Sequence, residues 1–500
     1  MNSWFLFIQG SSTGLRFVTL DAYLKCAFSG SMPMHDKPSH TSLARRLLKA
    51  ATGIAAGLAM LAASAAAHAQ SVIRDTEVER FLHDRTRPIL EAAGLDADRV
   101  QYLLVASDDL NAFATFRLRM GLNTGLILEA KTPNELFGVI AHETGHLSGG
   151  HMMRTDEIER AARAPMAIAL GLGIVAALAG SPDGAMGIIG SSGTFGTLNA
   201  LRYMQTQESA ADVAGIKALE KAGMSGKGLV DFFYNFRNVE TFSNAERYAF
   251  FRTHPLSRER IQSITSLAKR QSHYGEVDPP EVVEAFKIVQ AKLAGFMEDP
   301  VKTFRTYPES DTSYPARYAR VIATYKQGNW DKALTDLDTL ITEQPDNAYL
   351  HELKGQIYFE TGRAVLAKPE HLKSVQLMPQ APLLHLNLGQ TLIAIGDKEN
   401  LDQAVVVLRE SLKYEEDNSF TWSQLAQAYD SLNQPGMARL ATAEAQFYNG
   451  DYEGARTTAV RAQKFFPTTS PEFRRARDLV MVTSSEMGIN PVEGETKRRP

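Results

Sequence analysis

The chain has 500 residues, of which 44% are hydrophobic and 22% charged, a composition ordinary for a globular protein of two or three domains. Its formal net charge of −4 lacks the basic excess of nucleic-acid-binding proteins, so no nucleic acid is expected as a partner. Cys26 is the only cysteine, which excludes a disulfide framework.

Residues 1–69 have the features of a secretory signal peptide. A positively charged segment at 45–49 precedes an apolar, uncharged stretch at 51–67, and residues 67–69 form an Ala-x-Ala cleavage site. Residues 1–31 are more than such a peptide needs, so we interpret them as a mis-called N-terminal extension. The alternative is an uncleaved membrane anchor, which the shortness of the apolar stretch disfavours.

Cleavage before Gln70 would change the charge of the chain and remove its cysteine. Residues 1–69 hold six basic and two acidic residues, so 47 basic and 55 acidic residues remain and the net charge becomes −8. Loss of Cys26 leaves a chain compatible with an oxidising compartment. Together with the motifs described below, the signal peptide predicts a mature protein in a bacterial periplasm. Any contact with the outer membrane is expected to be peripheral.

The folded region is predicted to begin with a helix and a strand. Residues 72–98 are predicted to be helical, with Val78, Phe81 and Leu90 as candidate core positions. Residues 100–105 form a short apolar run of strand length, which indicates a buried strand.

Residues 111–128 alternate apolar and polar side chains in places, which predicts strands or a hairpin. We expect residues 124–128 to form the strand beside the helix that follows. An edge strand at that place could pair with an extended peptide substrate through backbone hydrogen bonds. An ordinary core strand is the alternative, and the two are compatible.

The helix expected from Pro133 carries an H-E-x-x-H motif, formed by His142, Glu143 and His146. Positions i and i+4 share one face of a helix, so both imidazoles can bind one zinc ion. Glu143 is then placed to act as general base on the attacking water. Gly145 lies inside the motif although glycine costs a helix about 1 kcal/mol relative to alanine.

A catalytic zinc ion takes three protein ligands and keeps one position open. The metzincin pattern requires histidine where this chain has Met152, and we interpret the neighbouring His151 as exposed or as a partner of a ligand. Glu208 and Asp212 lie four residues apart in a mostly helical stretch. We expect Glu208 to bind the zinc and Asp212 to hold a ligating histidine by its far ring nitrogen.

Between the motif and Glu208 lies a long uncharged segment. Residues 164–179 carry no charge and residues 180–196 are rich in glycine and serine. The apolar part is shorter than the roughly 20 residues of a membrane span. Two interpretations stay open. The apolar part is either a buried helix, followed by a glycine-rich lid over the cleft, or a hydrophobic flap that inserts into a membrane.

His254 is a further candidate, because Pro255 keeps the residue before it out of helical geometry and so places His254 on a loop. A loop histidine could donate a hydrogen bond to the reaction intermediate, or it could fill the open zinc position and block the enzyme. It could also have no role. Arg258 and Arg260 follow on a predicted helix and could orient carboxylates in the site.

Residues 76–265 resemble the zincin family that includes the CAAX prenyl protease and the heat-shock protease HtpX. The resemblance implies a zinc peptidase fold with one zinc ion per chain, and it points to the same histidine at position 254. Five segments carry the resemblance in the order of the family, namely 111–114, 123–126, the H-E-x-x-H motif, 208–212 and Thr253-His254-Pro255.

From about residue 313 the chain repeats. Gly328, Gly362 and Gly396 are spaced by 34 residues, which is the period of the tetratricopeptide repeat. Trp422 and Tyr429 fall on the aromatic positions of the same repeat consensus. We therefore expect four to five helix pairs stacked as a solenoid with a concave binding surface. Alternatively, the solenoid serves for dimerisation or simply stabilises the protease domain.

The sequence predicts a mainly α protein, with an α+β zincin-like metalloprotease domain followed by an α-solenoid of tetratricopeptide repeats. The predicted parts are a signal peptide at 1–69, a protease domain at 70–265, a helical connector at 266–312, the repeats at 313–487 and a disordered tail at 488–500.

Glu143 and Asp212 are the candidate catalytic residues, His142, His146 and Glu208 the zinc ligands, and His254 a regulatory ligand. This combination of domains resembles periplasmic proteases of Gram-negative bacteria. That resemblance implies unfolded or misassembled outer-membrane proteins as substrates and the β-barrel assembly machinery as a partner of the repeats, in a combined protease and chaperone role. The alternative is a non-catalytic chaperone with a structural zinc site, which would not need Glu143.

Overall fold

The structure is a computed structural model, and it describes residues 71–115, 118–151, 203–236, 250, 254 and 256–488. The predicted signal peptide, the uncharged segment at 164–196 and residues 489–500 of the predicted tail lie outside the described residues. The described residues from Val72 onward belong to one compact unit.

A four-stranded sheet in the order β1-β2-β4-β3 forms the base of the first domain. β2 runs parallel to β4, and the two outer strands β1 and β3 run antiparallel to their neighbours. The sheet ends at β3, which packs against the helix of the H-E-x-x-H motif. The strands are β1 (Val72–Ile73), β2 (Gln101–Val105), β3 (Ala112–Thr115) and β4 (Arg119–Asn123).

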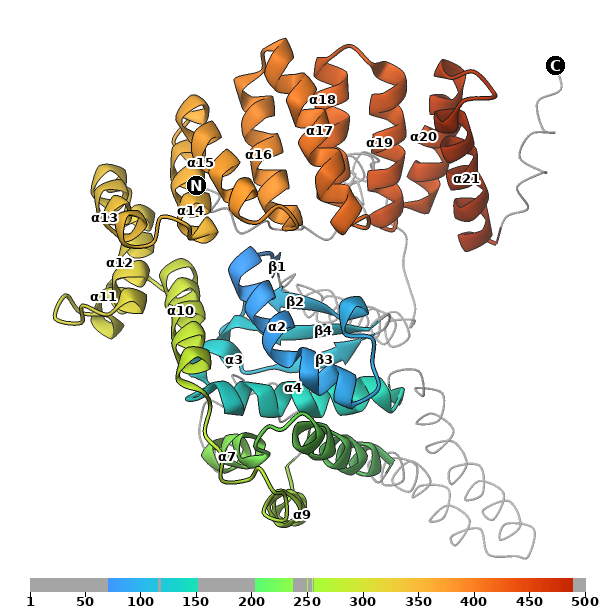
Figure 1. The fold of residues 1–500 in the computed structure, drawn as a ribbon. Helices are drawn as coiled ribbons and strands as arrows, with labels where there is room; N and C mark the ends of the chain where they lie inside the picture. The colour runs from blue at the N-terminus through green and yellow to red at the C-terminus, as the bar shows by residue number, and fades with distance from the viewer. Residues whose placement is uncertain are drawn as a thin grey trace, which may run out of the picture. The chain divides into compact units, whose positions relative to one another are not determined.

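Helices α2 (Thr76–Ala92) and α4 (Pro133–Ser148) enclose the core of this domain together with the sheet (Figure 1). Val78, Phe81 and Leu90 of α2 are buried, as predicted. The prediction of one helix over 72–98 is wrong at both ends. Val72 and Ile73 pair with β2 instead, because the Asp75 side chain caps the first turn of α2 and fixes its start.

The predicted strand at 124–128 is a helix, α3 (Thr124–Glu129). Its first four residues, Thr124 to Ile127, are all buried, and a short buried apolar run has the same sequence pattern in a strand as in a helix. A Cβ atom on Gly125 would lie 2.4 Å from the Asp108 carbonyl oxygen, so this helix begins in close contact with the loop after β2. The strand beside the motif helix is therefore β3.

The segment predicted as a connector contains α10 (Pro280–Met297), which packs against α2, α3 and α4 on one side and against α12 on the other. One apolar cluster continues from Ile73 through Phe286 to Ile357. α10 therefore joins the two predicted domains by a shared core. The neighbouring helices are α7 (Lys227–Phe236), α9 (Arg258–Ala268) and α11 (Pro300–Thr306).

Helices α12 to α21 form five successive helix pairs, which confirms the predicted solenoid (Figure 1). Four glycines at helix ends have φ angles of +76° to +82°. Gly328, Gly362 and Gly396 each follow the first helix of a pair, and Gly450 follows α19. Only glycine adopts this conformation without strain, which explains the 34-residue spacing of the first three. Asn433 takes the corresponding place after α18 with φ +57°.

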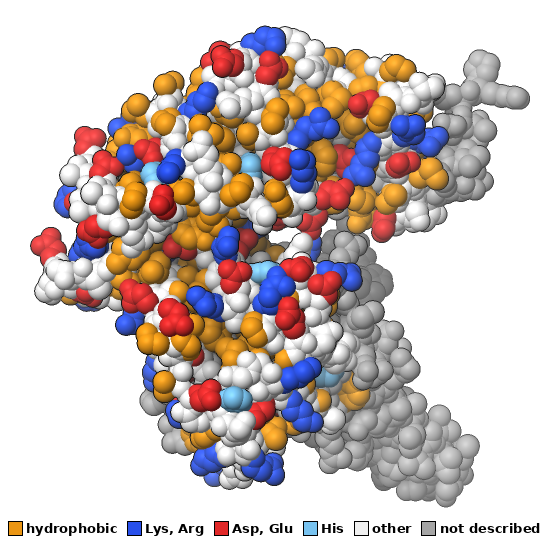
Figure 2. All heavy atoms as spheres, viewed as in Figure 1, with side chains coloured by type: hydrophobic (Ala, Val, Ile, Leu, Met, Phe, Trp, Pro, Cys, Tyr) orange, Lys and Arg blue, Asp and Glu red, His pale blue; other side chains and the backbone are white. Residues whose placement is uncertain are grey.

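The solenoid helices are α12 (Tyr314–Lys326), α13 (Trp330–Glu343), α14 (Ala348–Glu360), α15 (Ala364–Leu377), α16 (Pro382–Ile395), α17 (Lys398–Tyr414), α18 (Ser419–Ser431), α19 (Pro435–Tyr448), α20 (Tyr452–Ala462) and α21 (Pro471–Glu486). Acidic and basic side chains are interspersed on the visible face of these helices (Figure 2). Among the described residues no helix is both long and apolar enough to cross a membrane.

Candidate active site

Helix α4 holds the two motif histidines rigidly. Its first turn is fixed by Pro133 and by the Thr132 side chain, which accepts a hydrogen bond from the Glu135 backbone N–H. His142 is fully buried and His146 is 7% exposed. Both imidazoles therefore project from one face of a buried helix whose position is set by its packing.

A second helix, at 203–221, carries Glu208 and Asp212 to the same place. It crosses α4 so closely that a Cβ on Gly145 would lie 2.4 Å from the Ala211 carbonyl oxygen. A Cβ on Gly215 would likewise lie 2.7 Å from the Ala141 carbonyl oxygen. The glycine inside the motif thus has a structural cause, because a larger residue would separate the two helices that supply the site.

Four side chains converge at this crossing, those of His142, His146, Glu208 and His254. Nε2 of His142 lies 3.1 Å from Nε2 of His146 and 3.2 Å from Nδ1 of His254. The Glu208 carboxylate oxygens lie 3.3 Å from His146 Nε2 and 3.0 Å from His254 Nδ1. All four residues are buried.

This arrangement fits a zinc ion. Donors bound tetrahedrally at the usual 2.0–2.1 Å would lie about 3.3 Å from one another. Five of the six donor pairs lie 3.0 to 3.5 Å apart, close to that value, and all four donors lie within 4.8 Å of one another. Three imidazole nitrogens and a carboxylate are donors that zinc prefers, and in a buried site a cation at their centre would offset the mutual repulsion of their lone pairs.

Further side chains hold the ligands from outside. Asp212 Oδ1 lies 2.8 Å from His142 Nδ1, and His151 Nδ1 lies 2.9 Å from His146 Nδ1. Each motif histidine is therefore oriented through its far ring nitrogen, a contact that fixes the tautomer of a metal ligand. Asp212 thus holds a motif histidine, as expected from the sequence. His151 is a partner of the other one, which is one of the two interpretations given for it above.

Arg260 of α9 joins the two acidic residues. It donates two hydrogen bonds to the Asp212 carboxylate, at 2.6 and 2.8 Å, and its Nη1 lies 3.0 Å from Glu208. The same group donates to the backbone carbonyl of His254 at 3.3 Å. Arg258, the other arginine named from the sequence, is exposed and lies away from these contacts.

The charges of the site follow from these contacts. Burial raises the pKa of Asp212, but the hydrogen bonds from Arg260 and His142 outweigh it and hold that pKa below its usual value. Burial lowers the pKa of His142, but the partnership with Asp212 raises it to about 9. Glu208 has a depressed pKa for the same reason as Asp212, since its histidine neighbours outweigh its burial. Both carboxylates are therefore ionised at neutral pH.

Glu143 is fully buried beside the four donors, and neither oxygen of its carboxylate makes a hydrogen bond to the described residues. The His254 ring lies beside it, with Nε2 at 3.5 Å from Glu143 Oε1. A buried carboxylate with two free acceptors is costly unless a partner such as water or substrate completes it. Such a group is suited to accept a proton.

His254 is held in this place by an aromatic contact that the sequence did not indicate. The Phe250 ring stacks on the imidazole at 4.5 Å between centroids. The backbone N–H of His254 donates to the Phe250 carbonyl at 2.7 Å, and the Phe250 N–H donates to the Leu110 carbonyl, just before β3. In the sequence, Phe250 is marked only as an aromatic residue four positions before a histidine, a pattern too common to identify Phe250 as part of the site.

Comparison with known proteins identifies the domain. A family model described as peptidase family M48 matches residues 76–268. The metalloprotease LoiP of Escherichia coli strain K12 is 31% identical over 183 residues, covering 36% of this chain and 68% of LoiP. The chain belongs to peptidase family M48. It is a zinc-dependent metalloprotease, as its motif predicted.

The match to a second relative extends beyond the protease domain. The beta-barrel assembly-enhancing protease (BepA) of Escherichia coli strain K12 is 23% identical over 387 residues, which cover 75% of this chain and 76% of that protein. Among solved structures, MamA MSR-1 C2 aligns with 33% of this chain and 93% of its own, at 21% identity and a TM-score of 0.29. The similarity to BepA therefore covers three quarters of the chain and continues past the protease domain.

Proposed function

We propose that the protein hydrolyses peptide bonds of unfolded polypeptides, with His142, His146 and Glu208 as the zinc ligands. The zinc ion, when bound, supplies a Lewis acid that polarises the scissile carbonyl and stabilises the oxyanion. Glu143 accepts a proton from the attacking water and later delivers it to the leaving amine. The observation that carries this proposal is the buried, unpartnered Glu143 carboxylate beside the donor cluster.

The positioning residues in this proposal are Asp212 and Arg260. Asp212 fixes the ring of His142 and keeps its Nε2 directed at the other donors. Arg260 balances the charge of Asp212 and Glu208, so two carboxylates can stay ionised in a buried place. Substrate in an extended conformation can add to the sheet at its β3 edge.

The test is the Glu143→Gln variant with an unfolded protein such as reduced casein. We expect hydrolysis to fall by about 10²–10⁴-fold, the usual contribution of a general base, with zinc content unchanged by metal analysis. Glu259→Gln, at an exposed position of α9, serves as the matched control and should cleave like the parent. Full activity of Glu143→Gln with zinc bound would instead support a chaperone with a structural zinc site.

We also propose that His254 is a latch. Its Nδ1 lies within 3.2 Å of both His142 Nε2 and Glu208, at the corner that a catalytic site keeps open. With a metal ion held by His142, His146 and Glu208, the His254 imidazole would take the remaining position, exclude water from it and so restrain the protease. Because His254 lies next to Pro255 before α9, a movement of this short segment would open the corner when substrate docks.

Our proposal for the cellular role is supported by one named relative and by the predicted signal peptide. We propose that the mature chain, cleaved before Gln70, acts in a bacterial periplasm on unfolded or stalled outer-membrane proteins, with peripheral contact to the membrane. The solenoid would dock these substrates or the β-barrel assembly machinery, and a chaperone role would accompany proteolysis. The support is the relative named as enhancing β-barrel assembly, which matches this chain across protease and repeats. Crosslinking from the solenoid in cells would identify the partners.

A further inference from the structure

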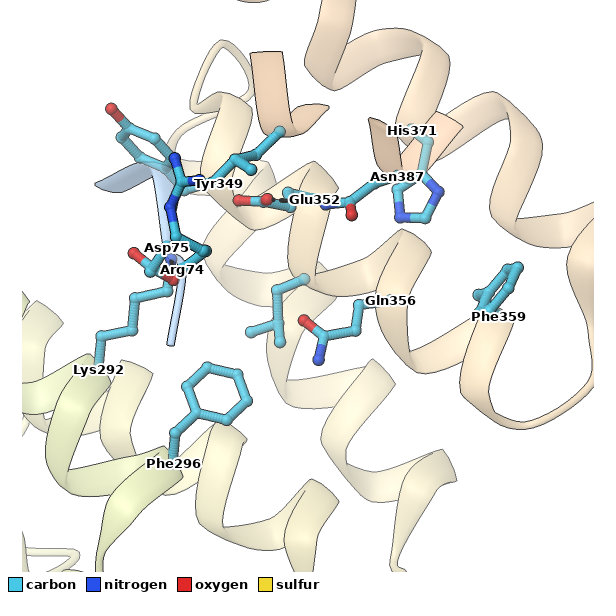
Figure 3. Close-up of a pocket in the computed structure, with 12 residues that line it drawn as sticks. Arg74, Asp75, Lys292, Phe296, Tyr349, Glu352, Gln356, Phe359, His371 and Asn387 are labelled. Carbon is cyan, nitrogen blue, oxygen red and sulfur yellow. Dashed lines mark hydrogen bonds and ion pairs between the residues drawn. The ribbon is translucent and has the colours of Figure 1, made fainter. Parts of the chain in front are cut away.

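A hollow lies where α10 meets α14, α15 and α16. Arg74, Asp75 and Lys292 lie on one side of it, and Glu352 and His371 lie across from them (Figure 3). Aromatic and aliphatic side chains complete the lining, among them Phe296, Tyr349 and Leu383. The hollow thus combines apolar walls with a small number of polar groups, as ligand pockets do.

Two buried polar atoms of its lining have no partner. Oε2 of Glu352 makes no hydrogen bond among the described residues, although Oε1 accepts one from Asn387 Nδ2 at 3.0 Å. Nε2 of His371 is also without a hydrogen bond, and that side chain is 3% exposed. Buried polar atoms are normally satisfied, so each of these calls for a partner that enters the hollow.

His371 offers an acceptor at this atom. The Thr391 hydroxyl donates to the Asn387 carbonyl at 2.9 Å, so the His371 Nδ1 atom, 2.8 Å from that hydroxyl oxygen, acts as donor. Nε2 then carries the lone pair. Burial lowers the pKa of His371 to about 4, which keeps the ring neutral. A group that pairs with His371 Nε2 or with the ionised Glu352 carboxylate must therefore be a hydrogen-bond donor.

The charges around the hollow favour a cation. Arg74 pairs with Glu79 and Glu415, and Lys292 pairs with Asp75 and Glu77. These two basic side chains thus have four carboxylate partners, and Glu352 adds a fifth carboxyl group. Acidic groups therefore outnumber basic ones around the hollow. Burial raises the pKa of Glu352 to about 8, with further contributions from Asp75 and Glu77, which shows how poorly its charge is compensated.

We propose that this hollow binds a lysine side chain of an extended polypeptide. The ammonium group donates to Glu352 Oε2 and His371 Nε2 and supplies the missing positive charge. The four methylene groups pack against the apolar walls, as long basic side chains do. The inference depends on the proposed function only in taking unfolded polypeptides as ligands of the solenoid, and it needs no catalytic step.

The experiment measures binding of two fluorescein-labelled unstructured peptides at pH 8. They are identical except that the single lysine of one is acetylated on its side chain. We expect the full-length protein to bind the lysine peptide about tenfold more tightly, the size of one charge-assisted hydrogen bond. The Glu352→Gln variant should lose this preference and bind both peptides alike. The Glu143→Gln substitution is present in every sample to prevent cleavage.

Asp346→Asn is the matched control, because it also removes one carboxylate from the solenoid but at a position 84% exposed. It should keep the tenfold preference, which an effect of net charge alone would not allow. Equal affinity for the two peptides of the protein that carries only Glu143→Gln would overturn the proposal. An undiminished preference in a folded Glu352→Gln variant would overturn it too. Absence of peptidase activity, by contrast, would leave these binding results intact.

Discussion

At the scale of single residues, His254 has contacts with both the ligands and the base. Its Nδ1 lies 3.1 Å or less from the Glu208 oxygens, while its Nε2 faces Glu143 at 3.5 Å. A side chain with both contacts cannot leave room for water at the same corner. In the proposed latch, both the restraint and the activation of the enzyme would depend on this one imidazole and on the short segment that carries it.

The first prediction is that His254→Ala hydrolyses an unfolded substrate faster than the parent, with zinc content little changed. A rise of about tenfold would correspond to a closed state favoured by about 1.4 kcal/mol. Initial rates and metal content are measured on the same samples. An inactive variant that keeps its zinc would make His254 a hydrogen-bond donor in the reaction, and loss of zinc would make it a structural ligand.

The second prediction concerns Glu352 and the pH dependence of stability. Its pKa is raised from 4.5 to about 8, because burial, Asp75 and Glu77, which raise it, outweigh Lys292 and the Thr76 hydroxyl, which lower it. The folded state then binds a proton that the unfolded state releases above pH 4.5. Its contribution is fully present below about pH 4.5 and is lost as the pH rises through 8.

Denaturant unfolding of the parent and of Glu352→Gln, from pH 5 to 8.5, checks this sign. The stability of the parent relative to the variant should fall steadily as the pH rises, because glutamine has no proton to lose. The other titrating groups are common to both proteins and cancel in the difference. A difference that stays constant over this range would contradict the raised pKa.

Sequence reasoning worked best for residues with a motif or a fixed spacing. The i, i+4 rule alone places His142 and His146 on one helix face, and Glu208 and Asp212 on another. It could not show which arginine of α9 reaches the site, because Arg258 and Arg260 have the same chemistry and differ only in helical phase. It gave no signal for Phe250 or for the hollow beside Glu352, which depend on packing between distant segments.

At the scale of elements, the crossing of α4 with the helix at 203–221 determines the site. The sequence showed Gly145 as a cost to α4 and nothing more, since helix propensity is a local property. The close approach of the Ala211 carbonyl explains why glycine occupies position 145 despite that cost. The prediction for residues 124–128 failed for a similar reason, because the neighbours that make α3 a helix are far away in sequence.

The third prediction is that Gly145→Ala weakens zinc binding and peptidase activity together. A Cβ 2.4 Å from a backbone oxygen must push the helices apart, which displaces Glu208 from His146. We expect a destabilisation of about 1–3 kcal/mol, although alanine favours the helix itself. Thermal unfolding and zinc titration measure the two effects. Gly275→Ala, where a Cβ would meet nothing within 4 Å, should be neutral in both.

At the scale of the whole molecule, α10 makes the protease domain and the first solenoid helices cooperative. Their side chains share one apolar cluster, whereas the last helices have a separate cluster around Leu479. Stacked repeats transmit stability mainly to their neighbours. Damage at α10 should therefore affect the catalytic domain and the start of the solenoid together, and damage at α21 should stay local.

The last prediction compares Phe286→Ala in α10 with Leu479→Ala in α21. Phe286 is 2% exposed and its ring stacks with that of Phe81 at 6.0 Å, so its loss should cost about 3–5 kcal/mol. Thermal inactivation reports on the protease domain, and tryptophan fluorescence reports on the solenoid, because Trp330 and Trp422 are the only tryptophans after the predicted signal peptide. Phe286→Ala should lower the midpoint of inactivation and that of the Trp330 signal together, whereas Leu479→Ala should leave inactivation near the parent value. Equal effects of the two substitutions on inactivation would mean that the solenoid unfolds as one unit with the protease domain, against the separation of the two clusters.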